Sequence, residues 1–416
     1  MTTHTYYVDS TPKVSDVWIY SNVSDSTKSA DEWKTILVCG LRKGGKHYFA
    51  LDITDTLNPI YLWEFPHASD PKISNYANFL NNTLGQSWSE PAIGKVKIRP
   101  AANAFERWVA FIRGGFDSIE RVGNDATTGK AFFVVDLKTG EIIKEFSGLP
   151  NMNHCFAAPP TAVDTNMDGF IDKVYIGDLG GQMWAFDVSS DNVNAWTGGI
   201  LFRPPAQPSE KHMIYYQPAV TFDQNRVPWV FFGTGNREDP NDFNNPPERF
   251  YAVKDDGLGN YQRTQGDLDN VTAAPQNTFN VATKKGWYIM LEKGMGSLEK
   301  VLAKPTVFNQ IVYFTTYKNV DTEDPCAGAG VSSLYAVEYR SGGGALAVDD
   351  LTDLSGPAGA RSKEVGIWAP STPVISINTN AQASVIIGTT SGQIFSDQAF
   401  SPSSGRELLY WREVTR

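Results

Sequence analysis

Cysteine and histidine are scarce in this sequence, whose 416 residues contain three cysteines and five histidines. Three cysteines are too few for a disulfide scaffold, and no two of them form a C-x-x-C pair. Cys39 lies in the apolar stretch ILVCG and is predicted to be a small buried residue. Cys155 and Cys326 lie in predicted loops, and their pairing in an oxidising compartment stays open. The histidines stand in separate contexts, without the H-E-x-x-H, G-x-S-x-G or paired-carboxylate patterns of hydrolases.

Long apolar runs and an excess of basic charge are also missing. No run of about 18 uncharged apolar residues occurs, so no transmembrane helix is predicted. The opening residues MTTHTYYVDS are polar, lack the apolar core of a signal peptide and already look like part of a strand. We therefore expect an N-terminal region of the full protein to be missing. The net charge of −10 argues against nucleic-acid binding, which requires a basic surface, and is compatible with cation binding.

A repeated unit runs along most of the chain. Each unit begins with proline, continues into a β-branched and aromatic strand that often ends in glycine, and closes with an aromatic strand that usually ends in an acidic residue. The opening prolines are Pro12, Pro91, Pro160, Pro218, Pro305 and Pro373. Short strands bounded by Gly, Pro, Asn and Asp, with little helical periodicity, predict an all-β protein.

The repeat predicts one β-propeller over residues 1–416, in which each blade buries its faces on its neighbours. Successive prolines are 58 to 87 residues apart, whereas a common propeller blade has ~40 to 50 residues, so irregular insertions are expected, chiefly at 66–90 and 236–248. Six units are countable and seven blades are expected, the seventh from GWYIML at 286–291 or from the two termini together. Two β-sandwiches are the less favoured alternative, because the repeat continues without a break in composition.

The stretch DTNMDGFID carries the clearest chemistry. Oxygen-bearing side chains stand at positions 1, 3, 5 and 9 of the loop, a glycine stands at position 6, and position 7 offers a backbone carbonyl. This is the order of ligands in an EF-hand loop, which binds Ca²⁺ through oxygen atoms in loose geometry. The predicted metal ligands are Asp164, Asn166, Asp168, the carbonyl of Phe170, and Asp172. A plain Asp/Asn/Gly turn is the alternative.

The loop also departs from the EF-hand pattern. Position 12 is Tyr175 instead of the bidentate glutamate, and it belongs to the strand-like segment KVYIG. Strand-like segments flank the loop on both sides in place of helices, so the ion is expected to order a pair of strands. No histidine-bearing open site of the kind that activates water accompanies the loop, so no catalytic role is predicted for the metal.

The segment AVDTNMDGFIDKVYIGDLGGQMWAFD resembles the calcium-loop blade of the PilY/PilC family, the type IV pilus tip-associated adhesins and assembly factors. WKTILVCGLRKGGKHYFALDIT, GKAFFVVDLKTGEIIKEF, WVFFGTGNRED and EDPCAGAGVSSLYAVEY resemble the same family in the same order. The resemblance implies a C-terminal domain with a modified, seven-bladed propeller. It also carries the family's calcium ligands over to Asp164, Asn166, Asp168, Phe170 and Asp172.

By resemblance, Ca²⁺ occupancy would regulate pilus extension and retraction, twitching motility and adhesion. The implied partners are minor pilins or the pilus tip, and host-cell or surface ligands. The implied location is outside the bacterial cytoplasm, at the cell surface, pilus tip, periplasm or outer membrane. Some family members have an Arg-Gly-Asp tripeptide near this blade; it is absent here, so attachment to integrins is not expected.

The main alternative is an enzyme, a quinoprotein dehydrogenase, whose propeller blades have similar strands. Such enzymes require an aspartate base, and many contain adjacent cysteines, which this chain lacks. Asp52, Asp136 and Asp187, which end blade strands, are instead predicted to cap turns. The acidic segment from Asp255 to Asp269 lacks metal-loop spacing and is predicted to be a solvated loop. A non-enzymatic protein is therefore expected.

Overall fold

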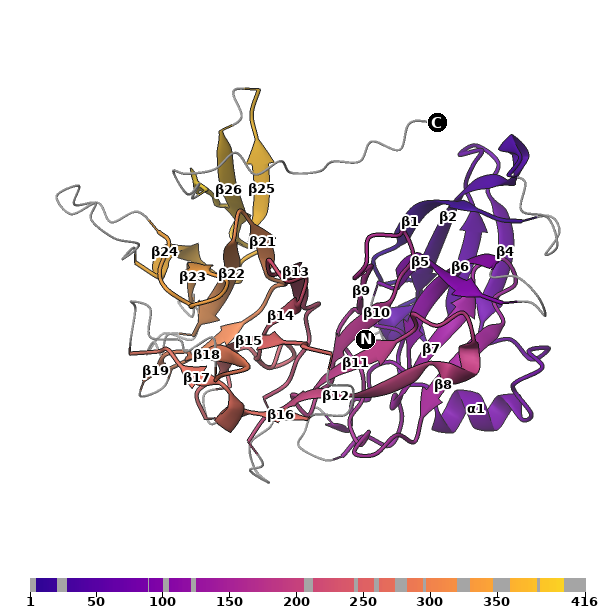
Figure 1. Ribbon diagram of the computed structural model, residues 1–416, viewed down its shortest axis with the longest axis horizontal. Helices are drawn as coiled ribbons and strands as arrows, with labels where there is room; N and C mark the ends of the chain where they lie inside the picture. Colours follow the sequence, from indigo (N-terminus) through magenta and orange to yellow (C-terminus); the bar gives the residue numbers. More distant parts are fainter. Residues whose placement is uncertain are drawn as a thin grey trace.

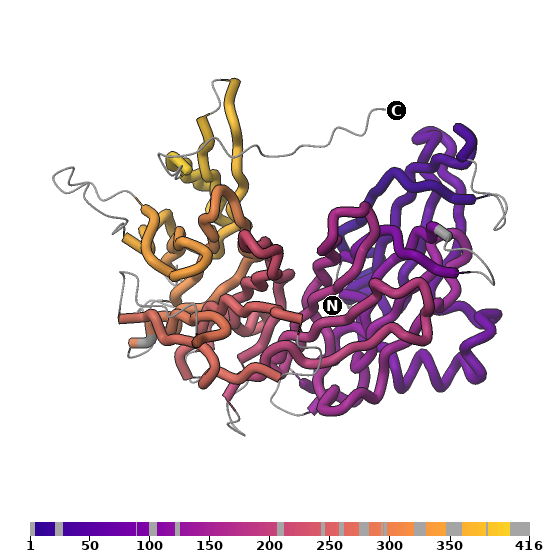
Figure 2. The backbone as a smooth tube through the Cα atoms, in the orientation of Figure 1, coloured from indigo at the N-terminus to yellow at the C-terminus, as the bar shows by residue number. Residues whose placement is uncertain are grey.

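Six β-sheets follow one another along the chain in the computed structural model (Figure 1). The structure describes residues 5–20, 28–88, 90–99, 105–120, 125–205, 212–242, 246–257, 262–273, 283–294, 297–319, 330–346, 360–379 and 382–399. The tube in Figure 2 passes along an arc, from an indigo sheet at the N-terminal end to a yellow sheet at the C-terminal end. Among the described residues, no helix is long and apolar enough to cross a membrane.

Neighbouring strands in the first, second and sixth sheets are consecutive in sequence and antiparallel. The first sheet contains β1 (Lys13–Trp18), β2 (Trp33–Gly40), β3 (Tyr48–Asp52) and β4 (Ile60–Phe65). The second contains β5 (Ala92–Ile98), β6 (Phe105–Arg113), β7 (Ala131–Asp136) and β8 (Ile142–Ser147). The sixth contains β25 (Val374–Ile377), β26 (Ala383–Gly388) and β27 (Ile394–Gln398). The helix α1 (Tyr76–Asn82) lies in the predicted insertion between β4 and β5.

The middle sheets are extended by short extra strands. The third contains β9 (Thr161–Val163), β10 (Lys173–Gly177), β11 (Met183–Asp187), β12 (Thr197–Arg203) and the distant β16 (Arg263–Thr264), which pairs with β12 in parallel. The fourth contains β13 (Ala219–Phe222), β14 (Pro228–Gly233), β15 (Arg249–Lys254), β18 (Gly286–Met290) and β17 (Asp269–Asn270). The fifth contains β21 (Thr306–Phe308), β22 (Ile311–Lys318), β23 (Val331–Glu338), β24 (Ser362–Ile367), β20 (Ser297–Val301) and β19 (Lys293–Gly294). Turns of 3-10 helix occur at Ala30–Glu32, Arg42–Gly44, Val193–Ala195 and Gln265–Asp267.

The repeat predicted these sheets correctly. Each opening proline stands immediately before a strand at one edge of a sheet, and these strands are β1, β5, β9, β13, β21 and β25. One expectation is wrong: GWYIML, the candidate for a seventh unit, forms β18, which pairs with β15 inside the fourth sheet. The part of the chain that the structure describes therefore contains six sheets.

The sheets pack face to face, with one apolar core cluster between each consecutive pair. Val17 and Phe133, for example, join the first and second sheets, and Phe250 and Phe314 stack at 3.7 Å between the fourth and fifth. The strands that follow the first five opening prolines, β1, β5, β9, β13 and β21, lie side by side in this order, so their sheets radiate from a common centre. Every residue of β7 and of β14 is buried because these strands are covered on both faces. In β27, by contrast, exposed and half-buried residues alternate.

Candidate metal-binding loop

The loop of residues 164–172 connects β9 to β10 in the third sheet. It turns sharply because Met167 and Gly169 have φ values of 63° and 88°, and the left-handed conformation at Gly169 is the one that glycine adopts without strain. The backbone of Asp172 then closes the loop, since its N–H donates to the carbonyl of Val163 at 3.0 Å. The carbonyl of Asp172 accepts from Val188 at 2.7 Å, which fixes the end of the loop beside β11.

Three predicted ligands bring their side-chain oxygens to the inside of this turn. Asp164 accepts hydrogen bonds from the backbone N–H groups of Met167 and Gly169, both at 2.6 Å. Asn166 accepts from the N–H of Asp168 at 2.9 Å, and Asp168 accepts from the N–H of Phe170 at 3.0 Å. The three side chains thus hold the loop in its folded-back shape, which is the geometry that places alternate oxygens around an ion in EF-hand loops.

Asp172 differs from the other acidic residues of the loop because it is buried. One of its carboxylate oxygens accepts from the N–H and the hydroxyl of Thr165, at 2.8 and 2.7 Å. The other lies 3.4 Å from the side-chain amide of Asn166. Asp172 therefore ties the first half of the loop to the strand that follows it.

Two lysines of the neighbouring sheet face the loop. Lys95 and Lys97 stand two residues apart on β5, so both point to the same side of the second sheet. Their ammonium groups lie 4.7 and 4.9 Å from the centre of the Phe170 ring. The Nζ of Lys97 also donates to Asp168 at 2.5 Å, and this hydrogen bond raises the pKa of Lys97 and lowers the pKa of Asp168.

The loop is fixed to β5 by its backbone as well. The N–H of Ile171 donates to the carbonyl of Lys95 at 2.8 Å. The side chain of Ile171 packs on Gly94 so closely that a Cβ at this position would lie 2.6 Å from Cγ1 of the isoleucine. The loop therefore lies at the boundary between the second and third sheets.

The donor set of the loop has the chemistry of a site for a hard cation: carboxylate and amide oxygens, with the ammonium of Lys97 standing where positive charge is favoured. Their present arrangement is not that of a closed metal cage. Within the described ranges, no three acidic, histidine or cysteine side chains converge closely enough to hold a metal. Asp168 is engaged by Lys97 and Asp172 by Thr165, so an ion would bind by drawing in carboxylates that now have other partners.

The strand after the loop contacts the fourth sheet. The hydroxyl of Tyr175, at position 12 of the EF-hand pattern, donates to Asp255 at 2.7 Å, and the Nζ of Lys173 donates to the same oxygen at 2.6 Å. Burial alone would raise the pKa of Asp255, but the charge of Lys173 and these two hydrogen bonds lower it. Burial and the Asp255 carboxylate raise the pKa of Tyr175, so its hydroxyl keeps the proton that it donates.

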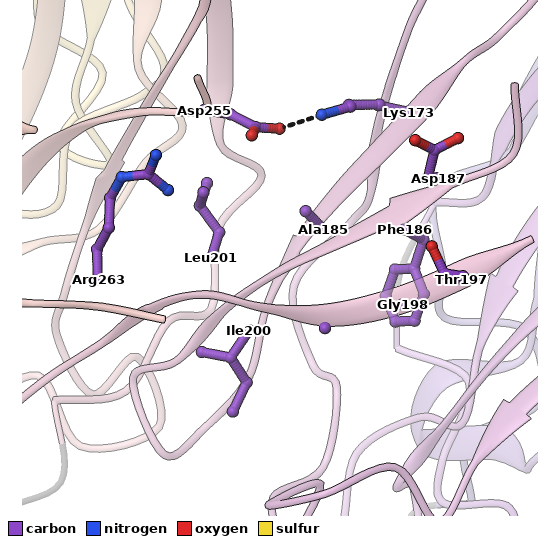
Figure 3. Close-up of a pocket in the computed structure, with 11 residues that line it drawn as sticks. Lys173, Ala185, Phe186, Asp187, Thr197, Gly198, Ile200, Leu201, Asp255 and Arg263 are labelled. Carbon is purple, nitrogen blue, oxygen red and sulfur yellow. Dashed lines mark hydrogen bonds and ion pairs between the residues drawn. The ribbon is translucent and has the colours of Figure 1, made fainter. Parts of the chain in front are cut away.

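Asp255 and Lys173 line a cavity of about 70 Å³, shown in Figure 3 with Arg263 and Asp187 around it. Sites for drug-sized ligands are about 300–1,000 Å³, so this space suits water and not an organic cofactor. Asp255 is buried and ion-paired, and the prediction of a solvated loop is therefore wrong for this residue. The spacing of the acidic residues gave no signal of it, because the partners are 80 and 82 residues away in sequence.

The structure also places the aspartates that end blade strands, the cysteines and His154. Asp52, Asp136 and Asp187 each accept a hydrogen bond from the backbone N–H two residues later, at 2.9, 2.8 and 3.0 Å, which confirms them as turn caps. Cys39 is buried as predicted, and Cys155 is a buried free thiol, whereas Cys326 lies outside the described residues. His154 is paired with Glu120 and packs on Gly180, beyond the end of β10 that is opposite to the loop.

The fold and the comparisons together define the class of the protein. Six face-packed sheets arranged around a centre are the architecture of a β-propeller. Residues 1–199 match the family model described as the PilY1 beta-propeller domain. The crystal structure of the C-terminal domain of PilY1 from Pseudomonas aeruginosa superposes with a TM-score of 0.67 at 21% identity, covering 95% of this chain and 85% of that one.

Similarity to curated proteins extends over most of the chain. It is 25% identical to the type IV pilus biogenesis factor PilY1 of Pseudomonas aeruginosa strain PAO1, over 82% of this chain. It is 27% identical to a PilY1 homolog of Xylella fastidiosa, over 99% of this chain. Residues 1–199 therefore match the PilY1 β-propeller domain, and the chain as a whole is similar to PilY1 proteins in sequence and fold. It spans about a third of the length of these relatives, 31% and 32%.

Proposed function

We propose that this chain is the calcium-binding, non-enzymatic propeller domain of a type IV pilus biogenesis factor and tip adhesin. Support comes from the match of residues 1–199 to the PilY1 β-propeller model and from relatives that are named as pilus biogenesis factors. In this proposal the domain is exported and works at the cell surface, the pilus tip, the periplasm or the outer membrane. Its partners are minor pilins or the pilus tip, together with host-cell or surface ligands.

The loop of residues 164–172 is the observation that carries the calcium part of the proposal. Asp164, Asn166 and Asp168, the carbonyl of Phe170, and Asp172 would hold the ion. A Ca²⁺ ion supplies two positive charges that attract six to eight oxygens at about 2.3–2.6 Å. Because the three aspartates repel one another, the ion would stabilise the closed form of the loop.

The position of the loop explains how occupancy would act at a distance. Its backbone is hydrogen-bonded to β5 of the second sheet through Ile171, and the strand that follows it is hydrogen-bonded to the fourth sheet through Tyr175. An ordered loop would therefore stiffen two sheet boundaries at once. We propose that this stiffening regulates pilus extension and retraction, and with them twitching motility and adhesion.

A role as an enzyme is not favoured by the chemistry of the site. In a dehydrogenase, Asp52, Asp136 and Asp187 would be candidates for the aspartate base, but each of them accepts a hydrogen bond that caps a turn. The carboxylates of the loop are arranged around a turn of backbone N–H groups, beside a lysine, without a histidine. Binding and ordering are the processes that such a group of residues performs best.

Thermal denaturation in excess EGTA and in excess Ca²⁺ tests the proposal. Ca²⁺ is expected to raise the melting temperature of the purified chain, because a ligand that binds only the folded state adds RT ln(1 + [L]/Kd) to its stability. Asp164→Ala should abolish the rise, while Asp187→Ala, which removes a turn-capping aspartate from the neighbouring strand, should retain it. Equal melting temperatures with and without Ca²⁺ would contradict the proposal.

A cellular experiment tests the biological part. A bacterial strain lacking its own copy of the full-length gene is complemented with the wild-type gene, with Asp164→Ala or with Asp187→Ala in this domain. Surface pili and twitching zones are then measured at matched expression. Loss of calcium-dependent motility with Asp164→Ala alone is expected, and equal motility in all three strains would contradict regulation by the loop.

A further inference from the structure

The second sheet supplies a cationic side chain to the loop. Lys97 donates to Asp168 at 2.5 Å, and its charge also interacts with the carboxylates of Asp164 and Asp172. Both members of the Lys97–Asp168 pair are only partly exposed, with 35% and 33% of their side chains accessible. The positive charge of Lys97 thus faces every acidic residue that the loop contains.

Lys95, its neighbour on β5, is placed differently. Its Nζ lies 3.7 Å from Glu106, which belongs to β6 of the same sheet and also binds Lys28 at 2.9 Å. Lys95 therefore has a carboxylate within its own sheet, whereas the ion pair of Lys97 is made with the loop of the next sheet. Both ammonium groups lie near the centre of the Phe170 ring, at 4.7 and 4.9 Å, so both lysines reach the loop from β5.

We infer that Lys97 competes with the metal ion for Asp168. Its ion pair with Asp168 holds the loop when no ion is bound and lowers the affinity of the loop for Ca²⁺. The inference rests on the proposed calcium site and assigns a residue that regulates it. Lys97 lies on a strand 67 residues before Asp164 and is absent from the EF-hand pattern.

Electrostatics gives the reason. An ammonium group beside Asp168 neutralises part of the charge that attracts Ca²⁺, and it must be displaced or remain next to a divalent cation of the same sign. Two unit charges 4 Å apart interact by about 1 kcal/mol even in water, and a divalent ion doubles this, while salt screens part of it. Removal of the charge is therefore expected to tighten Ca²⁺ binding by about tenfold.

Because of this competition the loop has two closed states, one held by Lys97 without the ion and one held by Ca²⁺. With Lys97 in place, the loop is tied to the second sheet through a side-chain ion pair and a backbone hydrogen bond. With Ca²⁺ in place, Asp168 would turn from the lysine toward the ion, while the backbone hydrogen bond of Ile171 and the packing of its side chain on Gly94 would still join the loop to β5. Binding of the ion would thus replace the Lys97–Asp168 ion pair with contacts inside the loop and keep the ordered loop against the second sheet.

Isothermal titration calorimetry with CaCl₂ on the purified chain tests the inference. Lys97→Met removes the charge and keeps the stem, and Lys97→Arg keeps the charge. Lys363→Met is a matched control, because Lys363 pairs with Asp397 at 3.5 Å and lies 5.5 Å from the ring of Phe395 in a distant part of the fold. We expect about tenfold tighter binding for Lys97→Met, and binding within about twofold of wild type for the other two variants.

The possible outcomes separate this inference from the proposed function. Calcium binding that is unchanged or weakened by Lys97→Met overturns the competition and leaves the calcium site intact. Equal tightening by Lys363→Met overturns it too, because the effect would then arise from net charge. Absence of calcium binding in all four proteins overturns the site itself. A second readout, the melting temperature in EGTA, should fall with Lys97→Met and rise more steeply with Ca²⁺ than it does for wild type.

Discussion

The hydroxyl of Tyr175 offers the sharpest test of how the loop is joined to the rest of the propeller. Tyr175→Phe removes the donor of the 2.7 Å hydrogen bond to Asp255 and leaves the buried ring in place, so it creates no cavity. Asp255 keeps Lys173 at 2.6 Å and the N–H of Gly257 at 3.3 Å. The substitution therefore isolates one charge-assisted hydrogen bond between the third and fourth sheets.

A hydrogen bond to a charged group contributes roughly 1.5–3 kcal/mol to stability. For a chain of this length the entropy of unfolding is about 0.9 kcal/mol per degree, so we expect the melting temperature to fall by about 2 to 3 °C. Differential scanning calorimetry at pH 7 in EGTA measures this change without any contribution from the ion.

Tyr288→Phe is the matched control. Tyr288 is buried in the same core cluster as Tyr175, but within the described part of the chain no charged side chain is hydrogen-bonded to its hydroxyl. Its loss is expected to lower the melting temperature by less than about 1 °C. Equal effects of the two substitutions, or no effect of Tyr175→Phe, would refute the conclusion that position 12 of the loop serves as an inter-sheet contact.

Three further predictions concern other parts of the same region. Gly94→Ala places a methyl group against Ile171 and is expected to cost about 1–3 kcal/mol, seen as a lower melting temperature in EGTA. Gly169→Ala puts a side chain at a φ of 88°, which costs about 1–2 kcal/mol, and calorimetry should find weaker Ca²⁺ binding. Burial raises the pKa of Asp178 to about 6, so its contribution to stability is greatest at low pH and is lost as the pH rises through 6. The free energy of unfolding of wild type relative to Asp178→Asn should fall by up to about 1.4 kcal/mol per pH unit between pH 4 and 6; a flat difference would contradict it.

The fold could be predicted because the same unit of proline and strands repeats along the sequence. Local signals, such as prolines before edge strands and aspartates at the ends of β3, β7 and β11, recur because these blades meet the same steric and hydrogen-bonding conditions. The segment GWYIML was misassigned because its composition fits any buried strand, and its pairing with β15 depends on residues more than 30 positions away. Periodicity identifies a strand but does not identify its partner.

The candidate site could be predicted only in part, because a sequence pattern identifies neighbouring residues and not distant partners. The alternating oxygens of the loop lie within nine residues, so a local pattern contains them. Lys97 and Asp255 reach the loop and the strand after it from 71 and 80 residues away, and each is one charged residue among many. In the sequence, Tyr175 only showed that the glutamate ligand of position 12 is missing. Its hydrogen bond to the fourth sheet is seen only in the folded structure.

The central claim is that this propeller binds one Ca²⁺ ion in the loop of residues 164–172. Equilibrium dialysis of the purified chain against calcium-45 measures the number of bound ions directly. Mg²⁺ is present to occupy surface carboxylates that bind divalent cations nonspecifically. We predict one saturable ion per chain for wild type and none for Asp164→Asn combined with Asp168→Asn. Wild-type binding that does not saturate, or the same stoichiometry in the double variant, would contradict the claim.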